Sequence, residues 1–238
     1  KTTTAVNLGA AIAKMGRRVL LIDLDPQANA SSGVGTSRSE DTLTTYDLLL
    51  GRRTLAEIVR PTEIDLLFVA PATPELAGAE VELVGEEERE ERLRISVEGV
   101  RREYDYVFID CPPSLGLLTL NALVASDSVI IPLQCEYYAL EGLSHLVDTI
   151  ERIRSSLNRS LQIQVIVLTM YDGRLNLSVQ GAEEARRHFG DRVYGTMIPR
   201  NVRLGEAPSF GRPVAAYDPS CLGAVSYELL AKEILEHE

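Results

Sequence analysis

The sequence predicts a doubly wound α/β domain, in which helices cover both faces of a mostly parallel β-sheet. Short apolar runs without polar alternation, such as residues 18–23 and 106–109, are typical of strands that are buried on both faces. Segments with apolar residues at helical spacing separate these runs along the chain, and this alternation indicates parallel strands joined by helices. The length of 238 residues, without a linker or repeat, fits a single domain that spans residues 1–238.

The composition excludes several classes of protein. No stretch of about 18 apolar residues is present, which argues against a membrane-spanning helix. The cysteines, Cys111, Cys135 and Cys221, are scattered and form no C-x-x-C pair, so we expect neither a disulfide framework nor a cysteine metal site, and we infer a reducing, cytoplasmic location. The net charge of −11 excludes nucleic-acid binding over the whole surface, although a local basic patch could still bind it.

The first helix is expected to begin at the threonines that follow Lys1 and to end at Gly16, where the lack of a Cβ favours a helix C-terminus. Apolar residues at helical spacing give this helix a buried stripe: Ala5, Leu8, Ile12 and Met15. The strand at residues 18–23 follows directly. A helix that leads into a buried strand implies a first strand upstream of Lys1, and this strand is absent from the chain.

Further elements follow from the same two patterns. Polar, turn-rich residues 25–39 predict a loop at the carboxyl end of a strand, where ligands bind in open α/β sheets. Helices are expected at residues 45–50, 54–59, 76–83, 117–125, 140–157, 177–189 and 224–235, and strands at 66–70, 106–109, 128–132, 163–170 and 193–198. The charged stretch from residue 84 to 103 is also expected to be helical, with its glutamates on a solvated face. Right-handed crossovers would place the carboxyl ends of the strands at one edge of the sheet.

The candidate site combines Lys1, Thr2 and three aspartates. A lysine and a hydroxyl at the start of a helix suit a nucleoside triphosphate, because the lysine meets the β- and γ-phosphates, the hydroxyl meets Mg²⁺ and the helix N-terminus faces the anion. Asp110 ends a later buried strand and can hold the same Mg²⁺, and Asp23 and Asp25 end another strand. The lysine and threonines alone are a weak signal, since the glycine-rich half of a phosphate loop does not precede them.

Five motifs, in order along the chain, carry a resemblance to a known family: Lys1-Thr2-Thr3-Thr4, Leu24-Asp25-Pro26-Gln27, Ile109-Asp110-Cys111-Pro112-Pro113-Ser114, Glu136-Tyr137-Tyr138-Ala139-Leu140-Glu141-Gly142 and Ile198-Pro199-Arg200-Asn201-Val202-Arg203-Leu204. From Lys1 to Glu238 the chain resembles the ParA/Soj chromosome-partitioning ATPases, which belong to the deviant-Walker-A class of P-loop NTPases that also contains MinD. Members of this family carry K-G-G-V-G before the residue that matches Lys1. Their signature lysine, which reaches across an ATP-sandwich dimer, has no counterpart in this sequence.

The resemblance implies a role for each candidate residue. Lys1 would neutralise charge on the β- and γ-phosphates of ATP, Thr2 would ligate Mg²⁺, and Thr3 would hydrogen-bond to the α-phosphate. Asp25 would orient the attacking water, so Lys1 and Asp25 are the expected catalytic residues. Asp110 would hold Mg²⁺ through a water molecule.

Three further features have both a functional and a structural interpretation. Asp23 would support the metal or the first switch loop, although a carboxylate at a strand end can equally cap backbone N–H groups. Residues 112–117 would form a second switch loop, or they could be a strand end terminated by prolines. Pro199 and Asn201 resemble the adenine-binding turn of the family, although an asparagine after a strand is often a turn former.

Two arginines, Arg174 and Arg203, match positions at which members of the family bind DNA. Other arginines of the C-terminal third could widen this patch: Arg186, Arg187, Arg192, Arg200 and Arg212. We expect phosphate contacts that are independent of DNA sequence and that weaken steeply with salt. The alternative is a set of scattered surface arginines that keep an acidic protein soluble.

The resemblance therefore predicts an ATP-dependent switch for chromosome or plasmid partitioning. A weak Mg²⁺-dependent ATPase would bind double-stranded nucleoid DNA as an ATP-bound homodimer, until a ParB-like centromere-binding protein stimulates hydrolysis. A replication initiator is a further expected partner, and Tyr137 and Tyr138 are either a partner-facing pair or half-buried residues.

The main alternative is a MinD-like division-site ATPase that cycles on membranes. That function needs a basic amphipathic helix at the C-terminus, whereas residues 227–238 are acidic and would be repelled by anionic lipid. An iron–sulfur redox protein is disfavoured by the placement of the cysteines, and a scaffold that binds nucleotide without hydrolysing it is disfavoured by Asp25.

Overall fold

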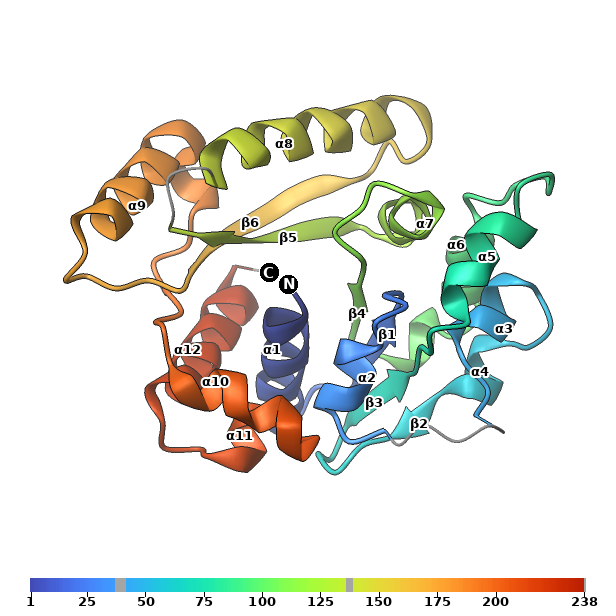
Figure 1. Cartoon of the computed structure of the whole chain (residues 1–238), viewed down its shortest axis with the longest axis horizontal. Helices are drawn as coiled ribbons and strands as arrows, with labels where there is room; N and C mark the ends of the chain where they lie inside the picture. The colour runs from blue at the N-terminus through green and yellow to red at the C-terminus, as the bar shows by residue number, and fades with distance from the viewer. Residues whose placement is uncertain (37–41, 136–138, 238) are drawn as a thin grey trace.

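The computed structural model describes the backbone of residues 1–36, 42–135 and 139–237 (Figure 1). A four-stranded sheet has the order β2-β3-β1-β4, and β5 and β6 form a separate pair. The strands are β1 (Val19–Asp23), β2 (Arg60–Pro61), β3 (Leu67–Ala70), β4 (Tyr106–Asp110), β5 (Ser128–Gln134) and β6 (Gln162–Thr169). β1 is parallel to β3 and β4, β5 is parallel to β6, and the two-residue β2 is antiparallel to β3. The predicted α/β class with mostly parallel strands is confirmed.

Helices separate most of the strands, and apart from the charged stretch at residues 84–103 the expected helices lie within two residues of their predicted ends. They are α1 (Thr2–Lys14), α2 (Asn29–Gly33), α3 (Thr45–Leu49), α4 (Leu55–Ile58), α5 (Leu76–Glu82), α6 (Arg92–Glu98), η1 (Arg101–Glu103), α7 (Leu117–Ala125), α8 (Ala139–Ser156), α9 (Asn176–Phe189), η2 (Gly190–Arg192), α10 (Val202–Glu206), η3 (Ala207–Phe210), α11 (Val214–Tyr217) and α12 (Leu222–Glu236). The sequence does not predict α2, α10 and α11, which are too short to show a helical period. No helix in the described parts of the chain is long and apolar enough to span a bilayer.

Both faces of the strands are covered, because successive side chains of a strand point to opposite faces. All of β1 is buried. Val19 and Leu21 pack with residues of α1 and α12, whereas Leu20 and Ile22 pack with residues of α3 to α7. β6 repeats this pattern, with α12 on one face and α8 and α9 on the other. The result is a layer of strands between two layers of helices (Figure 1).

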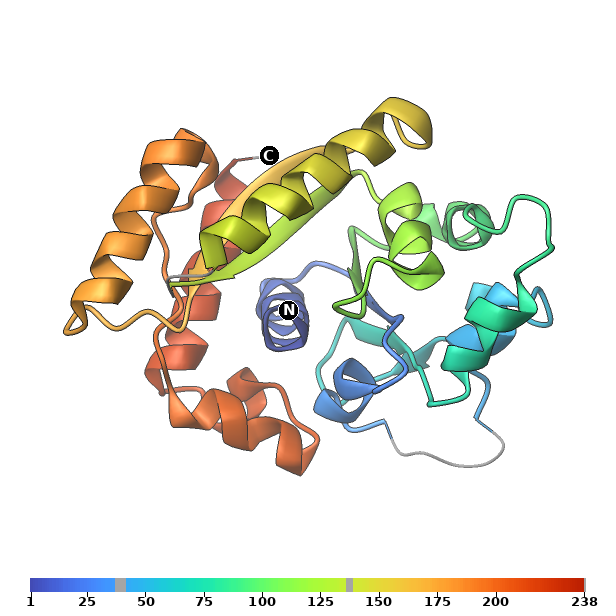
Figure 2. The same cartoon turned by 45° about the horizontal axis from the view of Figure 1, so that its top comes forward.

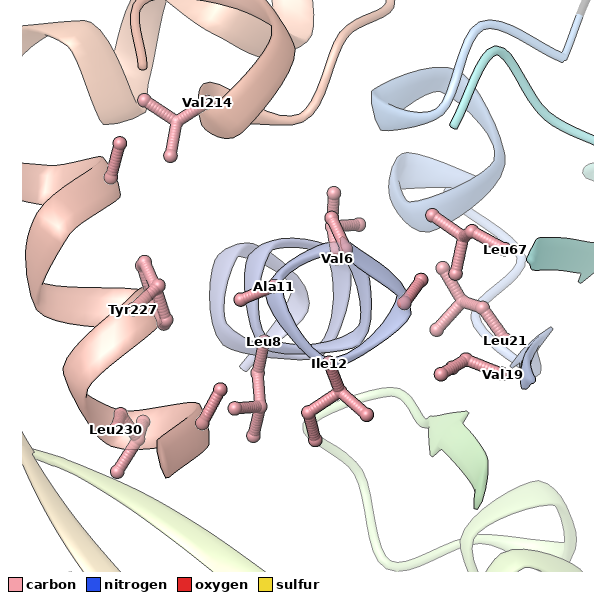
Figure 3. Packing of buried hydrophobic residues seen from close by; sticks show 14 of the residues in the cluster. Val6, Leu8, Ala11, Ile12, Val19, Leu21, Leu67, Val214, Tyr227 and Leu230 are labelled. Atoms are coloured by element: carbon pink, nitrogen blue, oxygen red, sulfur yellow. The ribbon is translucent and has the colours of Figure 1, made fainter. Parts of the chain in front are cut away.

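The helix α1 lies between β1 and α12 (Figure 3). Its buried residues continue a cluster that reaches both neighbours: Val6, Leu8, Ala11 and Ile12 from α1, Val19 and Leu21 from β1, and Tyr227 and Leu230 from α12. Two buried polar contacts fix the same helix to the C-terminal part of the chain. The Thr4 and Tyr227 hydroxyls lie 3.2 Å apart, and the Asn7 carboxamide oxygen accepts a 2.7 Å hydrogen bond from the Val214 N–H. The first turn of α1 is thus held by packing and by hydrogen bonds.

A cavity of about 560 Å³ lies between β4 and β5, beside the first turns of α1. Figure 2, which looks along α1, shows its N-terminal end between the two sheets. The edges of β4 and β5 that line this cavity have no strand partner among the described residues. Residues 106–109 are therefore only partly buried, although the sequence predicts a strand covered on both faces. The first strand that the sequence implies would fit between these two open edges.

The predicted strand at residues 193–198 is wrong. Within the described residues the segment forms one isolated bridge, between Val193 and Ile166, and the Tyr194 and Ile198 N–H groups bond to β6. Between them, the N–H groups of Gly195 and Thr196 donate instead to the Glu233 carboxylate of α12, at 2.7 and 2.9 Å. A side chain from a distant helix has taken the donors that a strand ladder needs.

The charged stretch at residues 84–103, which was expected to be helical, is helical only in part. Residues 84–91 form turns or irregular backbone, and helix resumes only at α6. Glutamates that would repel each other four residues apart on a helix, such as Glu86 and Glu90, oppose a helix here. Glu88 has a left-handed φ of 52°, which a right-handed helix cannot contain.

Candidate functional site

The carboxyl ends of β1 and β4 bring two aspartates side by side. Asp23 and Asp110 are partners in the parallel register of these strands. The pairing continues for one residue beyond β1, because the Leu24 N–H donates to the Asp110 carbonyl at 2.8 Å. The structure therefore places both acids at one edge of the sheet, where ligands bind in folds of this class.

The N-terminus of α1 opens onto the same edge. Lys1 is the N-cap residue of this helix, and no side chain caps the first turn. The Lys1 carbonyl accepts the N–H groups of Thr4 and Ala5, at 2.8 and 2.9 Å. The Thr2 hydroxyl hydrogen-bonds to the Asp110 carboxylate. A positive helix end and a hydroxyl thus converge beside a carboxylate.

Asp110 is the most perturbed of the acids at this edge. Its side chain is buried, and burial raises its pKa to about 6, against the Thr2 hydrogen bond, which lowers it. The negative charges of Asp23 and Asp25 contribute to this rise of the pKa. Its Oδ2 atom is buried and has no hydrogen-bond partner in the described residues. A buried carboxylate oxygen without a partner requires an explanation, and a cation is the simplest one.

The donors at this edge fit Mg²⁺. A carboxylate and a hydroxyl are hard oxygen ligands, and Mg²⁺ commonly takes one or two carboxylates and completes its shell with water and substrate phosphates. No cluster of three or more His, Cys, Asp or Glu side chains in the described part of the chain could hold a metal by itself. An ion bound by Thr2 and Asp110 would therefore take its other ligands from phosphate and water.

Asp23 organises the loop that follows β1. Its Oδ1 accepts the Asp25 N–H at 3.1 Å, and its Oδ2 accepts the Ser31 N–H at 2.8 Å and the Ser31 hydroxyl at 2.7 Å. Burial raises the pKa of Asp23, and these hydrogen bonds oppose the rise. Of the two interpretations left open by the sequence, the described contacts are those of a carboxylate that caps backbone N–H groups and supports a loop.

Ser31 links this loop to the end of β3, and the sequence holds no signal that singles it out. Its hydroxyl donates to Asp23 and accepts the Ala72 N–H at 3.0 Å, all within the interior. We expect Ser31→Ala to lower the free energy of unfolding by about 2 kcal/mol, because it leaves the buried Ala72 N–H without a partner and removes the hydrogen bond from the hydroxyl to the Asp23 carboxylate. Urea unfolding measures this. The control is Ser32→Ala, whose hydroxyl bonds only to the Ala28 carbonyl in the described structure, and an equal loss in both variants would contradict the prediction.

Asp25 lies in the turn between β1 and α2. It is 8% exposed, and its Oδ1 accepts the Gln27 N–H at 2.9 Å. Its carbonyl accepts the Ala28 N–H, and Ala28 has a left-handed φ of 54°. Asp25 is close enough for its charge to raise the pKa of both Asp23 and Asp110. The three carboxylates thus repel one another, and a cation among them would relieve the repulsion.

The loop at residues 112–116 connects β4 to α7. The Thr119 hydroxyl donates to the Ser114 carbonyl at 2.6 Å, which ties the loop to the first turns of the helix. A Cβ at Gly116 would collide with the Glu80 carboxylate, which shows how closely Gly116 approaches α5. Leu115 is 57% exposed. Sequence reasoning named this loop as a switch but did not find Thr119 or Glu80.

The other predicted residues lie elsewhere in the chain. Asn201 is the N-cap of α10, with its side-chain oxygen accepting the Arg203 N–H at 2.9 Å, and Pro199 pairs with Tyr171 in an isolated bridge. These contacts are those of a turn former, and a role in adenine binding stays a prediction. Tyr137 and Tyr138 lie outside the described residues.

The two arginines predicted to bind DNA are both exposed and both paired. Arg174 follows β6 and makes a two-pronged contact with Asp172, Nε to Oδ1 at 2.9 Å and Nη2 to Oδ2 at 2.7 Å. Arg203, on α10, contacts Glu206 at 2.7 Å and Asp218 at 3.2 Å. Hydrogen bonds between residues 171 and 198–200 join the loop of Arg174 to the segment that leads into α10.

Comparison with known proteins identifies relatives over the whole chain. A family model described as an AAA domain matches residues 1–163. Sporulation initiation inhibitor protein Soj of Bacillus subtilis is 54% identical over 234 residues, which are 98% of this chain and 92% of the relative. Chromosome partitioning protein ParA of Myxococcus xanthus is 53% identical over 238 residues, which are 100% of this chain and 84% of the relative.

Solved structures share the arrangement of elements. Cobyrinic acid a,c-diamide synthase from Mycobacterium smegmatis, with bound ADP and magnesium, superposes with a TM-score of 0.85 at 32% identity, over 99% of this chain and 89% of that chain.

Proposed function

This chain belongs to the Soj/ParA family of chromosome-partitioning ATPases, and from that premise we propose that it hydrolyses ATP with Mg²⁺ at the edge formed by α1, β1 and β4. Lys1 would neutralise β- and γ-phosphate charge, Thr3 would bond to the α-phosphate, and Thr2 and Asp110 would hold the Mg²⁺. Asp25 would orient the water. No arginine finger is evident, so we expect unassisted turnover of about one event per minute to per hour.

The observation that carries this proposal is the Oδ2 atom of Asp110. It is buried and has no partner in the described structure, and it belongs to a carboxylate that already touches the Thr2 hydroxyl. Phosphoryl transfer needs little covalent help from the protein, so catalysis depends on positioning and on neutralising charge. The N-terminus of α1, the Thr2 hydroxyl and the carboxylates meet at this edge, and with the Lys1 side chain they would supply both.

The ATPase would drive a DNA-segregation switch. ATP would join two subunits, and the dimer would place Arg174 and Arg203 of both subunits on double-stranded DNA of the nucleoid. A ParB-like partner would stimulate hydrolysis and release the dimer, with a replication initiator as a further candidate partner. Pro112 and Pro113 restrict the loop after β4 to few backbone states, so that contact with the γ-phosphate could select one.

The Asp25→Ala variant tests the catalytic assignment. We expect it to bind Mg²⁺-ATP but to hydrolyse it about 100-fold more slowly or worse, since the residue that aligns the water is gone. The rate is measured as phosphate release, in a chain extended at its N-terminus by a phosphate-loop segment. The control is Asp65→Ala, which removes an exposed acid near β3. Hydrolysis at the parent rate would favour a nucleotide-binding scaffold instead.

The competing function is membrane cycling of the MinD type. The last turns of α12 carry Glu228, Glu233 and Glu236, so this end is acidic and would be repelled by anionic lipid. Pelleting with anionic liposomes in the presence of ATP separates the two functions. We expect no more protein to pellet with liposomes than without them. Nucleotide-dependent pelleting with liposomes would overturn the proposal in favour of the membrane function.

A further inference from the structure

The arginines proposed to bind DNA are each neutralised by carboxylates of the same chain, and we propose that these carboxylates keep a single subunit off DNA, so that binding requires several arginines at once. The inference rests on the proposed function, because it concerns how the proposed DNA face is regulated. It assigns a role to Asp172, Glu206 and Asp218.

The pair of Asp172 and Arg174 shows how the neutralisation is built. The carboxylate is held in place by its own backbone, since its Oδ1 also accepts the Arg174 N–H at 3.1 Å, and the Asp172 N–H donates to the Ser178 hydroxyl at 3.1 Å. The Asp172 side chain is 16% exposed and that of Arg174 is 89% exposed. The arginine faces solvent, but Asp172 already occupies the edge formed by its Nε and Nη2 atoms. This edge of a guanidinium group can otherwise donate two parallel hydrogen bonds to a phosphate.

Arg203 is occupied in a similar way by two acids. Its Nη1 contacts Glu206 within α10, and its Nε contacts Asp218, beyond α11. Arg212, another arginine of the predicted patch, contacts Glu63 at 3.1 Å. Several positive charges of the predicted patch are thus matched by negative charges. Asp172 and Glu206 are near neighbours in the sequence, whereas the fold brings Asp218 and Glu63 close.

The charge balance decides how strongly such a face attracts DNA. Non-specific affinity comes from phosphates neutralised by cations that carry net charge, and an arginine paired with a carboxylate adds little of it. The net charge of −11 adds a general repulsion. Exposed ion pairs are weak, however, so an array of phosphates that meets several of them together can displace the carboxylates. A dimer offers the paired arginines of two subunits to such an array, whereas one subunit offers only half as many.

The Asp172→Asn variant tests this. Asparagine keeps the side-chain oxygen for the Arg174 N–H but removes the negative charge. We expect the chain to bind a fluorescein-labelled duplex of random sequence about 3- to 10-fold more tightly at low salt, with a salt dependence steeper by about one ion, because one more cation is available to phosphate. Fluorescence anisotropy over a series of salt concentrations measures both quantities.

A matched control lies at the opposite edge of the sheet. Asp127, which precedes β5, also pairs with an arginine: both of its carboxylate oxygens accept from Nη2 of Arg101, at 2.9 and 3.0 Å, whereas Asp172 follows the parallel strand β6. Asp127→Asn changes the net charge equally and should leave DNA affinity within about 1.5-fold of the parent. An equal increase of DNA affinity in both variants would show that the change of net charge causes the effect, and it would overturn the inference.

Other outcomes separate this inference from the proposed function. If Asp172→Asn binds DNA as the parent does or more weakly, while Arg174→Ala loses affinity, the DNA face is supported but its neutralisation is rejected. If Arg174→Ala binds as the parent does, the DNA contact itself is wrong. Asp218→Asn, which should free Arg203 in the same way, keeps the test open should Asp172→Asn fail to fold.

Discussion

The Asp110→Asn variant is expected to be more stable than the parent at neutral pH and to lose Mg²⁺-dependent ATP hydrolysis. Burial raises the pKa of Asp110 from 3.8 to about 6, so its ionised form is disfavoured in the folded chain. One pKa unit corresponds to about 1.4 kcal/mol, and ionised Asp110 therefore costs the fold about 3 kcal/mol at most. Asparagine removes this cost and keeps an acceptor for the Thr2 hydroxyl, and we expect a net gain of about 1–3 kcal/mol.

The stability difference between Asp110→Asn and the parent should change with pH in a direction that follows from the raised pKa of Asp110. The pKa of Asp110 is higher in the folded than in the unfolded chain, so its contribution to stability is complete below pH 3.8 and is lost as the pH rises through about 6. The advantage of the variant should therefore be small near pH 4 and reach its full size by about pH 7. Urea unfolding of both proteins across this range measures it, with Asp127→Asn as a control in which an exposed acid is neutralised. A difference that does not change with pH would show that the ionisation of Asp110 is not its source.

Extending the chain at its N-terminus is expected to raise its affinity for Mg²⁺-ATP by about 100-fold or more, if about 20 residues that include K-G-G-V-G precede Lys1. The N–H groups of a glycine-rich loop donate to phosphate oxygens, and hydrogen bonds to charged groups contribute about 1.5–3 kcal/mol each, so two of them suffice. The added residues would also provide a strand partner for the open edges of β4 and β5. Titration calorimetry with a non-hydrolysable ATP analogue compares the two chains.

Two controls separate phosphate contact from folding. An extension that keeps the strand but replaces its glycines should restore stability without the gain in affinity. The Lys1→Ala variant of the extended chain should lose most of that gain, because the amine that neutralises the phosphates is absent. Equal affinities of the extended and original chains would mean that the phosphates are held elsewhere in the molecule.

Much of the fold could be predicted because it depends on residues a few positions apart. The apolar stripe from Ala5 to Met15 predicts α1, and the uninterrupted apolar run before Asp23 predicts a strand covered on both faces. The position of Asp23 and Asp110 at one edge follows from the handedness of parallel crossovers, which holds for nearly any sequence with this alternation. The candidate acids were therefore found before their contacts were known.

The errors fall where partners come from distant parts of the chain. The segment at residues 193–198 has the composition of a strand, but Glu233 of α12 takes the N–H groups of Gly195 and Thr196. The role of Asp23 depended on Ser31, which lies in a short helix without a periodic signal.

The sequence by itself determined the class of fold, the order of its main elements and the acids and threonines of the candidate site, because periodicity and strand ends are local properties. Only the tertiary structure decided that Asp110 is buried with an oxygen that has no partner in the described residues, and that Asp218 lies close enough to pair with Arg203. Burial and long-range charge pairing depend on which groups meet across the folded chain, and the spacing of residues along the sequence does not specify those meetings.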